Sequence, residues 1–238
     1  MTQHALGEQT AGRPRILFTA GPTHEPIDAV RFIGNRSSGR LGIALAEAAV
    51  ARGWETGLLL GPTCQQPSDS RVHLDRFRTA EDLRGLLRTR LPGVDVLVMA
   101  AAVADYRAKG GAHDPRGKLR REGSGLMLEL EPTPDLLAEA ADAARPDQLL
   151  VGFALEPVDR LLTSAAEKLR RKKLDLIVAN PLETMDASGI DAWILASAWI
   201  GRSDEPIRVG PMSKVEFADR LLDEIAGALE RIPNKVSR

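Results

Sequence analysis

A glycine- and serine-rich segment near the start of the chain carries residue types well suited to binding an anion. It ends in the run Asn35-Arg-Ser-Ser-Gly-Arg-Leu-Gly42, directly before an apolar helical pattern. The free N–H groups and the dipole of a helix N-terminus attract phosphate, and the hydroxyls of Ser37 and Ser38 are suited to cap the helix or to donate to phosphate oxygens. Close approach of the backbone to a ligand is eased by three glycines: Gly34, Gly39 and Gly42. The segment therefore predicts a phosphate-binding site.

Two common nucleotide-binding motifs do not match this segment. The dinucleotide fingerprint G-x-G-x-x-G is absent, and the phosphate-loop pattern G-x-x-x-x-G-K-[ST] is approached from Gly34 to Gly39 but continues with Arg40-Leu41. The alternative interpretation is a glycine-rich turn with serine caps and no ligand. Such a turn requires neither Asn35 nor two flanking arginines, which favours the anion site.

The elements that must position this segment follow an alternating pattern. Short apolar runs alternate with longer helical patterns, which is typical of βαβ units and a mostly parallel sheet. We expect strands at 15–19, 55–60, 72–77, 94–99, 126–130, 149–153 and 174–179, with an apolar run at 192–200. We expect helices at 38–52, from Thr79 to Pro92, at 134–144, up to Lys173 and at 214–229. The segment then leaves the carboxyl end of the first strand, where ligands bind in such sheets.

Composition excludes several classes of protein. The chain has 238 residues, 32 basic and 33 acidic side chains and a net charge of −1, so we expect no nucleic-acid partner. Cys64 is the single cysteine, and no His/Cys spacing matches a structural zinc site. No stretch approaches the ~20 apolar residues of a membrane span, so we expect no membrane association and a cytoplasmic location. We expect a flexible tail over 1–13 and one domain over 14–238.

Seven stretches, taken in order, match one known family. They are residues 16–49, 101–107, 118–121, 133–137, 151–156, 173–180 and 213–214. The most specific are Asn35-Arg-Ser-Ser-Gly39 with the upstream Arg31, and Ala101-Ala-Val-Ala-Asp-Tyr-Arg107. Through these residues the chain resembles phosphopantothenoylcysteine synthetase, the ligase of coenzyme A biosynthesis. The resemblance implies that 4′-phosphopantothenate attacks CTP to form an acyl-cytidylate, from which the amine of L-cysteine displaces the nucleotide.

The resemblance also implies roles for individual residues. Asn35 and Lys118 are the expected catalytic residues: Asn35 holds the carbonyl oxygen of the acyl-nucleotide, and Lys118 lies on a flap over about 106–125. The expected substrate-binding residues are Arg31, Asn35 and Arg36. The expected nucleotide-binding residues are Gly21, Ser37, Ser38, Gly39, Ala101, Ala102, Asp105, Lys118 and Phe153. Asp105 is also the expected ligand of Mg²⁺, since a phosphate together with a triphosphate demands cations and aimed N–H donors.

Each of these roles has a structural alternative. In the alternative interpretation, Asn35 forms a turn and Arg31 is a solvated cation on the surface. Asp105 is also suited to cap a helix, Phe153 to pack in the core, and Lys118 to lie in a basic run on a solvated face. The family pattern K-x-K-K is Lys118-Leu-Arg-Arg121 here, which leaves open any role that needs an ammonium at its last two positions. In the family an acidic residue follows the asparagine that matches Asn180, and here Pro181 occupies that position.

These inferences define one expected architecture and one expected activity. We expect a Rossmann-like, doubly wound α/β fold with an irregular insertion that forms a flap and a dimer contact. The expected protein is a CTP- and Mg²⁺-dependent ligase that acts as a homodimer with a shared active site and binds no flavin. Two rivals remain: an NAD(P)-dependent reductase, which the fold favours and the missing fingerprint disfavours, and a non-catalytic nucleotide-binding module.

Overall fold

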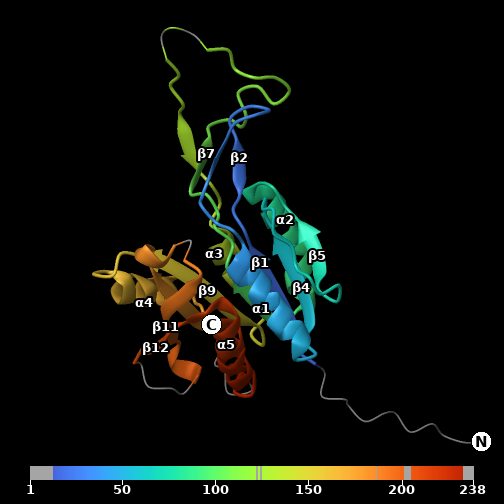
Figure 1. Cartoon of the computed structure of the whole chain (residues 1–238), viewed down its shortest axis with the longest axis vertical. Helices are drawn as coiled ribbons and strands as arrows, with labels where there is room; N and C mark the ends of the chain where they lie inside the picture. Colours follow the sequence, from blue (N-terminus) through green and yellow to red (C-terminus); the bar gives the residue numbers. More distant parts are fainter. Residues whose placement is uncertain (1–12, 122, 124, 186, 201–204, 233–238) are drawn as a thin grey trace, which may run out of the picture.

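A central parallel sheet organises the computed structural model, which describes residues 13–121, 123, 125–185, 187–200 and 205–232 (Figure 1). In this part of the chain the sheet has eight strands in the order β12-β11-β10-β9-β6-β1-β4-β5. The strands are β1 (Arg15–Ala20), β4 (Glu55–Leu60), β5 (His73–Arg76), β6 (Val96–Met99), β9 (Leu149–Glu156), β10 (Leu176–Pro181), β11 (Gly189–Ala196) and β12 (Ile207–Ser213). All pair in parallel except β11 and β12, which pair antiparallel at one edge.

The parallel strands follow the order of a doubly wound nucleotide-binding sheet. Renumbered by their position along the chain, they run 3-2-1-4-5-6, and the order reverses between β1 and β6. At such a switch point the connections that leave two neighbouring strands diverge to opposite faces of the sheet and leave a crevice. The predicted Rossmann-like fold class is thus confirmed, and the predicted phosphate-binding segment leaves β1 at the crevice.

Helices cover both faces of the sheet. One face buries α1 (Arg40–Ala51) and α5 (Lys214–Leu229), whose Leu45 and Phe217 are fully buried with Ile16 and Phe18 of β1. The other face buries α2 (Ala80–Arg90), α3 (Leu136–Ala143) and α4 (Leu161–Arg171). Successive residues of a strand point to opposite faces, so nearly continuous apolar strands supply both cores. None of the helices in the described part of the chain is long and apolar enough to cross a membrane.

A β-arm projects from the carboxyl edge of the sheet (Figure 1). It consists of the hairpin β2–β3 (His24–Pro26 and Phe32–Gly34) and of the described residues between 106 and 132, in which β7 (Tyr106–Ala108) pairs with β8 (Leu130–Pro132). Backbone bonds tie its two halves together: Ala29 N–H donates to the carbonyl oxygens of Asp114 and Gly117, each at 3.0 Å. The arm holds the predicted flap. The expected division into a tail over 1–13 and one domain over 14–238 stays a prediction, and residues 1–12 lie outside the described part.

Several predicted elements differ in detail from the structure. The strand expected at 126–130 is present only from Leu130, where it pairs with β7, and the apolar run 192–200 divides between β11 and a 3₁₀ turn at Ala198–Ile200. The hairpin β2–β3 and the edge strand β12 were not predicted, because their strands are short or half polar and lack a clear alternation. Pro134, expected in the first turn of α3, precedes the N-cap Asp135. The N-cap at Thr79 is confirmed by a capping box with Asp82.

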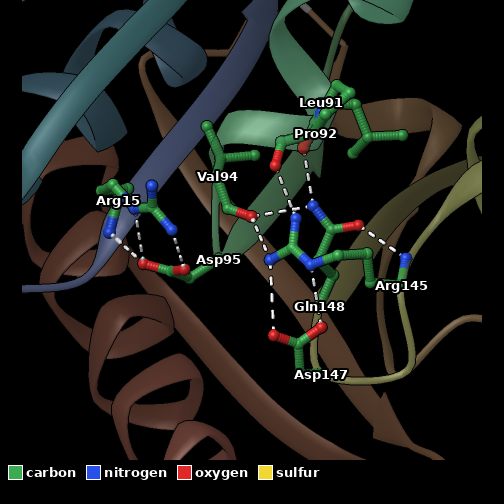
Figure 2. A network of polar contacts seen from close by, with 8 residues as sticks. All are labelled: Arg15, Leu91, Pro92, Val94, Asp95, Arg145, Asp147 and Gln148. Atoms are coloured by element: carbon green, nitrogen blue, oxygen red, sulfur yellow. Dashed lines mark hydrogen bonds and ion pairs between the residues drawn. The ribbon is translucent and has the colours of Figure 1, made fainter.

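A polar network lies at the amino edge of the sheet, where β1, β6 and β9 begin (Figure 2). Gln148, buried before β9, donates through Nε2 to the carbonyl oxygens of Leu91 (2.6 Å) and Val94 (2.8 Å). Beside it the Arg15 guanidinium pairs with Asp95 at 2.8 Å. The network satisfies buried polar groups where three chain segments meet, and it leaves the carboxyl edge free for ligands.

Candidate active site

A large cavity opens at the carboxyl edge of the sheet, at the switch point between β1 and β6. Its volume is about 980 Å³, enough for a nucleotide together with a second small substrate. The walls come from the segment 34–42, the end of β6 and the residues after it (99–105), the start of α3, and the end of β9. Elements far apart in sequence therefore build one pocket, as the topology requires.

The N-terminus of α1 forms one wall of the cavity. The N-cap is Gly39, in the left-handed conformation at φ 73°, and no side chain caps the helix. Ser37 and Ser38 line the cavity but do not cap α1, so of the two roles considered for them the capping role is wrong. Gly42 explains the close fit of the helix, since a Cβ there would lie 2.4 Å from Ala20 Cβ. A helix start without a side-chain cap leaves first-turn N–H groups for an anion.

The second wall combines Asn35 with the segment after β6. The side-chain amide of Asn35 donates to the carbonyl oxygen of Val103 at 2.9 Å. Ala101 and Ala102 offer small side chains and backbone groups at the cavity, and Asp105 is exposed there. The base of the arm is fixed beside them, because Ala104 N–H donates to Thr23 Oγ1 at 2.9 Å. Asn35 and Asp105 therefore share one pocket with the α1 N-terminus.

Two lysines that the sequence analysis did not single out also line the cavity. Lys168 and Lys172 lie one helical turn apart at the end of α4. Lys168 Nζ donates to the carbonyl oxygen of Phe153 at 2.6 Å, and Lys172 Nζ pairs with Asp135 Oδ1 at 2.8 Å. Phe153 itself both lines the cavity and packs against the core. The i, i+4 spacing places both lysines on one face of the helix. The sequence does not show that this face is turned to the cavity, because five of the six residues from 168 to 173 are basic.

Burial perturbs the charges of this cluster. Burial lowers the pKa of the Lys168 ammonium, and the positive charge of Lys172 lowers it further. Burial, the largest single influence, opposes ionisation of Asp135, but the hydrogen bonds from Lys172 and the Ala138 N–H together with the charges of both lysines outweigh it, and the pKa of Asp135 falls below its usual value. The lining of the whole cavity carries a net positive charge, which suits the phosphates of a ligand, because five cations (Arg36, Arg40, Lys168, Lys172 and Lys214) outnumber three carboxylates (Asp105, Asp135 and Glu156).

Three predicted residues lie outside the lining of the cavity. Gly21 is buried behind the wall, at φ 78°, where its carbonyl oxygen accepts a hydrogen bond from Ala102 N–H at 2.9 Å. Arg31 and Lys118 lie on the arm, with Lys118 exposed. Arg36, in contrast, lies at the cavity with the serines that follow it. Within one chain, most of the predicted site residues thus line the cavity, whereas Arg31 and Lys118 lie apart from it on the arm.

A resident metal centre is not evident among the described residues. No three His, Cys, Asp or Glu side chains there lie close enough together to hold an ion. Mg²⁺ usually binds proteins through one or two carboxylates and substrate phosphates and keeps several waters. The exposed carboxylate of Asp105 beside an anion-binding wall fits an ion that arrives with a triphosphate.

The fold and the cavity define a class: a doubly wound α/β protein with a polar, cation-lined cavity at its switch point. Residues 11–229 match the family described as the DNA/pantothenate metabolism flavoprotein C-terminal domain, and the chain belongs to this family. It is similar to the coenzyme A biosynthesis bifunctional protein CoaBC of Mycobacterium tuberculosis, with 38% identity over 93% of this chain and 54% of that protein. It is also similar to a cysteine/cysteine sulfinic acid decarboxylase of an unknown prokaryotic organism, with 43% identity over 75% of this chain and 48% of that protein.

A solved structure matches almost end to end. The crystal structure of the C-terminal domain of a CoaBC protein has a TM-score of 0.75 and 35% identity, covering 91% of this chain and 96% of that one. The chain spans about half the length of the curated relatives that it matches. The part of CoaBC to which it is similar is the C-terminal domain, as the solved structure and the family match both indicate.

Proposed function

We propose that this chain is a phosphopantothenate–cysteine ligase of coenzyme A biosynthesis. The observation that carries the proposal is the cavity at the switch point, where an α1 N-terminus without a side-chain cap, Asn35 and two inward lysines meet in a domain that matches the CoaBC C-terminal domain over nearly its full length. A ligase for this reaction must hold a triphosphate, a carboxylate and an amine together. The cavity offers positive charge for the first and an amide donor for the second.

The first step of the proposed reaction activates the carboxylate. An oxygen of 4′-phosphopantothenate attacks the α-phosphorus of CTP, the bond to the β-phosphate breaks, and pyrophosphate leaves. The α1 N–H groups and the Lys168 and Lys172 ammonium groups hold the phosphates and counter the charge of the leaving pyrophosphate. Asp105 would hold Mg²⁺ together with the nucleotide, and the ion would supply further positive charge at the phosphates. The choice of CTP over ATP belongs to this proposal.

The second step forms the amide bond. The cysteine nitrogen attacks the acyl carbon, the bond to CMP breaks, and the amine loses a proton. Negative charge grows on the acyl oxygen as the nitrogen approaches, so a preorganised donor there accelerates the step. The Asn35 side chain is a neutral amide with two N–H donors, one of which is held by Val103. We assign the other to the acyl oxygen.

We also propose that the active site is completed by a second copy of the chain. Arg31 and Lys118 lie on the arm, away from the cavity of their own chain, although an acidic substrate would use their charge. The arm exposes a set of large apolar side chains: Val30, Phe32, Tyr106, Leu126, Met127 and Leu130. Apolar side chains gathered on a projecting element mark a contact surface, which supports a homodimer.

A mixing experiment tests the shared site. Asn35→Ala impairs the cavity and leaves the arm intact, whereas Lys118→Ala does the reverse. If the arm of one chain serves the cavity of the other, each mixed dimer of the two inactive variants contains one intact site, so a statistical 1:1 mixture recovers up to about a quarter of the wild-type activity. No recovery, with mixed dimers verified by mass, contradicts the shared site.

One assay separates the ligase from the two rivals. The protein is incubated with phosphopantothenate, cysteine, Mg²⁺ and CTP, ATP or NADPH, and pyrophosphate and product mass are followed. Pyrophosphate release that depends on phosphopantothenate is the expected result. NADPH consumption would support the reductase, and nucleotide binding without turnover would support the module. The absence of bound flavin and the cytoplasmic location stay predictions, of which the visible absorbance spectrum checks the first.

A further inference from the structure

The arm is organised around one buried carboxylate. Asp28 lies in the turn between β2 and β3, and its side chain is 0% exposed, whereas the neighbouring Ala29 and Val30 are exposed. A buried charge requires partners for its lone pairs, because removing an ion from water without them is unfavourable. An aspartate is rarely buried in full unless it is paired, least of all in a projecting element.

The two oxygens of Asp28 have different partners. Oδ1 accepts hydrogen bonds from the N–H groups of Val30 (2.8 Å) and Arg31 (2.7 Å), which closes the turn. Oδ2 accepts from the Arg31 guanidinium, through Nε at 2.9 Å and Nη2 at 2.5 Å, and from Leu119 N–H at 3.1 Å. The hydrogen bonds from the Arg31 side chain hold the pKa of this carboxyl well below its usual range, so Asp28 is ionised at neutral pH.

Leu119 is therefore held by both of its backbone groups. Its N–H donates to Asp28, and its carbonyl oxygen accepts from Arg31 Nη2 at 3.0 Å. The residue before it is Lys118, so the Asp28–Arg31 pair fixes the backbone next to this lysine across 91 positions of sequence. The turn alone needs only Oδ1. The contacts of Oδ2 instead join the hairpin to the basic segment that begins at Lys118.

We propose that Asp28 is a positioning residue that holds Arg31 and Lys118 in one fixed arrangement, so that the arm presents both cations to an acidic substrate as a unit. The inference rests on the proposed function, in which these two residues serve the substrate. Preorganisation of this kind matters because a misplacement of about 1 Å in a binding group costs about 10²-fold in rate. Asp28 touches no substrate in this proposal and acts only through its two partners.

Asp28→Asn is the central variant, since asparagine keeps an oxygen for the turn and loses the charge that binds Arg31. Glu131→Gln is the matched control, because it removes another carboxylate–arginine pair of the arm, Glu131–Arg107 at 2.8 Å, that does not touch Leu119. We expect Asp28→Asn to lower kcat/KM for phosphopantothenate by about 10²-fold. The control is expected to change it less than threefold. Equal values for both variants would overturn the proposal.

A double-mutant cycle separates positioning from general damage to the arm. If Asp28 acts through Lys118, then Asp28→Asn lowers activity less in the Lys118→Ala background than in the wild type. The same proportional loss in both backgrounds would overturn the proposal.

Amide exchange gives a readout independent of turnover. In the intact chain, the Leu119 amide is expected to exchange at least 10-fold faster in Asp28→Asn and unchanged in Glu131→Gln. Unchanged exchange in Asp28→Asn would overturn the proposal. If the wild type shows no ligase activity but exchange at Leu119 still accelerates, the proposed function fails and the positioning of this segment stands.

Discussion

The side-chain amide of Asn35 lies 2.9 Å from the carbonyl oxygen of Val103, which joins the segment after β1 to the segment after β6 across the switch point. These are the two connections that diverge at the crevice of the sheet. Their junction holds Asn35 at the cavity before any substrate arrives, which is what a donor aimed at a developing charge requires.

Asn35→Ala is expected to separate the two steps of the reaction. The acyl-nucleotide should still form, because the phosphates contact other groups, but its transfer to cysteine should slow by about 10²–10³-fold. Rapid-quench measurement of the acyl-nucleotide and of the final product distinguishes the steps. Wild-type transfer in this variant would show that Asn35 does not serve the acyl oxygen.

The close packing of α1 on β1 predicts a strong effect at Gly42. A Cβ at this position would lie 2.4 Å from Ala20 Cβ, so Gly42→Ala must displace the N-terminus of α1. We expect a loss of about 1–3 kcal/mol in the free energy of unfolding and weaker nucleotide binding. Gly85→Ala in α2 is the control, since a Cβ there meets nothing within 4 Å. Urea titrations should show this control stabilised by about 1 kcal/mol.

We expect the buried Lys168 to lower the stability of the fold and to strengthen the binding of nucleotide. Burial lowers the pKa of its ammonium, so the folded state disfavours the charge and gains stability as pH rises from the folded pKa to the unfolded one. Lys168→Met should therefore stabilise the protein by about 1 kcal/mol at pH 7, with a smaller gain at alkaline pH. The KM for nucleotide should rise at least about tenfold, since a charge-assisted contact is lost.

Arg171→Met is the control for Lys168→Met, because Arg171 lies on the same helix and is exposed. It should leave both the melting temperature and the KM nearly unchanged. Calorimetry across pH and steady-state kinetics check the pair of variants. A Lys168→Met protein that is less stable than the wild type at pH 7 would contradict the assigned cost of burial.

The Arg15–Asp95 pair predicts a pH-dependent stability with no effect on activity. Burial opposes ionisation of Asp95, but hydrogen bonds from Arg15 outweigh it and lower the pKa of the carboxyl. The stability that the pair contributes is thus complete above the unfolded-state pKa, about 3.9, and is lost as pH falls through the lower folded-state pKa. Asp95→Asn should cost about 1 kcal/mol or less at pH 7 and nothing at the acid end. Urea midpoints at several pH values check this, and a difference that persists in acid would contradict it.

Asp105 predicts that Mg²⁺ binds together with the nucleotide. One exposed carboxylate is a weak site alone, so titration calorimetry should detect no Mg²⁺ binding to the free protein at millimolar concentration. Chelation by EDTA should stop turnover, and Asp105→Asn should raise the Mg²⁺ concentration needed for half-maximal rate by about tenfold. Tight binding of Mg²⁺ without nucleotide would mean that the ion has protein ligands of its own.

Local patterns in the sequence determined much of the architecture. Apolar runs predicted the parallel strands, helical spacing predicted α1 and α5, and Thr79 with Asp82 predicted the start of α2, because each depends on neighbouring residues alone. The candidate phosphate-binding segment could be predicted for the same reason: glycine, serine and a helix start are adjacent in the chain.

Only the tertiary structure decided which distant residues meet. The basic run 168–173 does not reveal that Lys168 and Lys172 face the cavity, because their direction depends on how α4 packs on β9 and β10. Likewise, Arg31 is close to Asn35 in sequence, yet the hairpin β2–β3 carries it away from the cavity and into contact with Asp28 and Leu119. Such pairings arise from strand order and long-range hydrogen bonds, which no local spacing encodes.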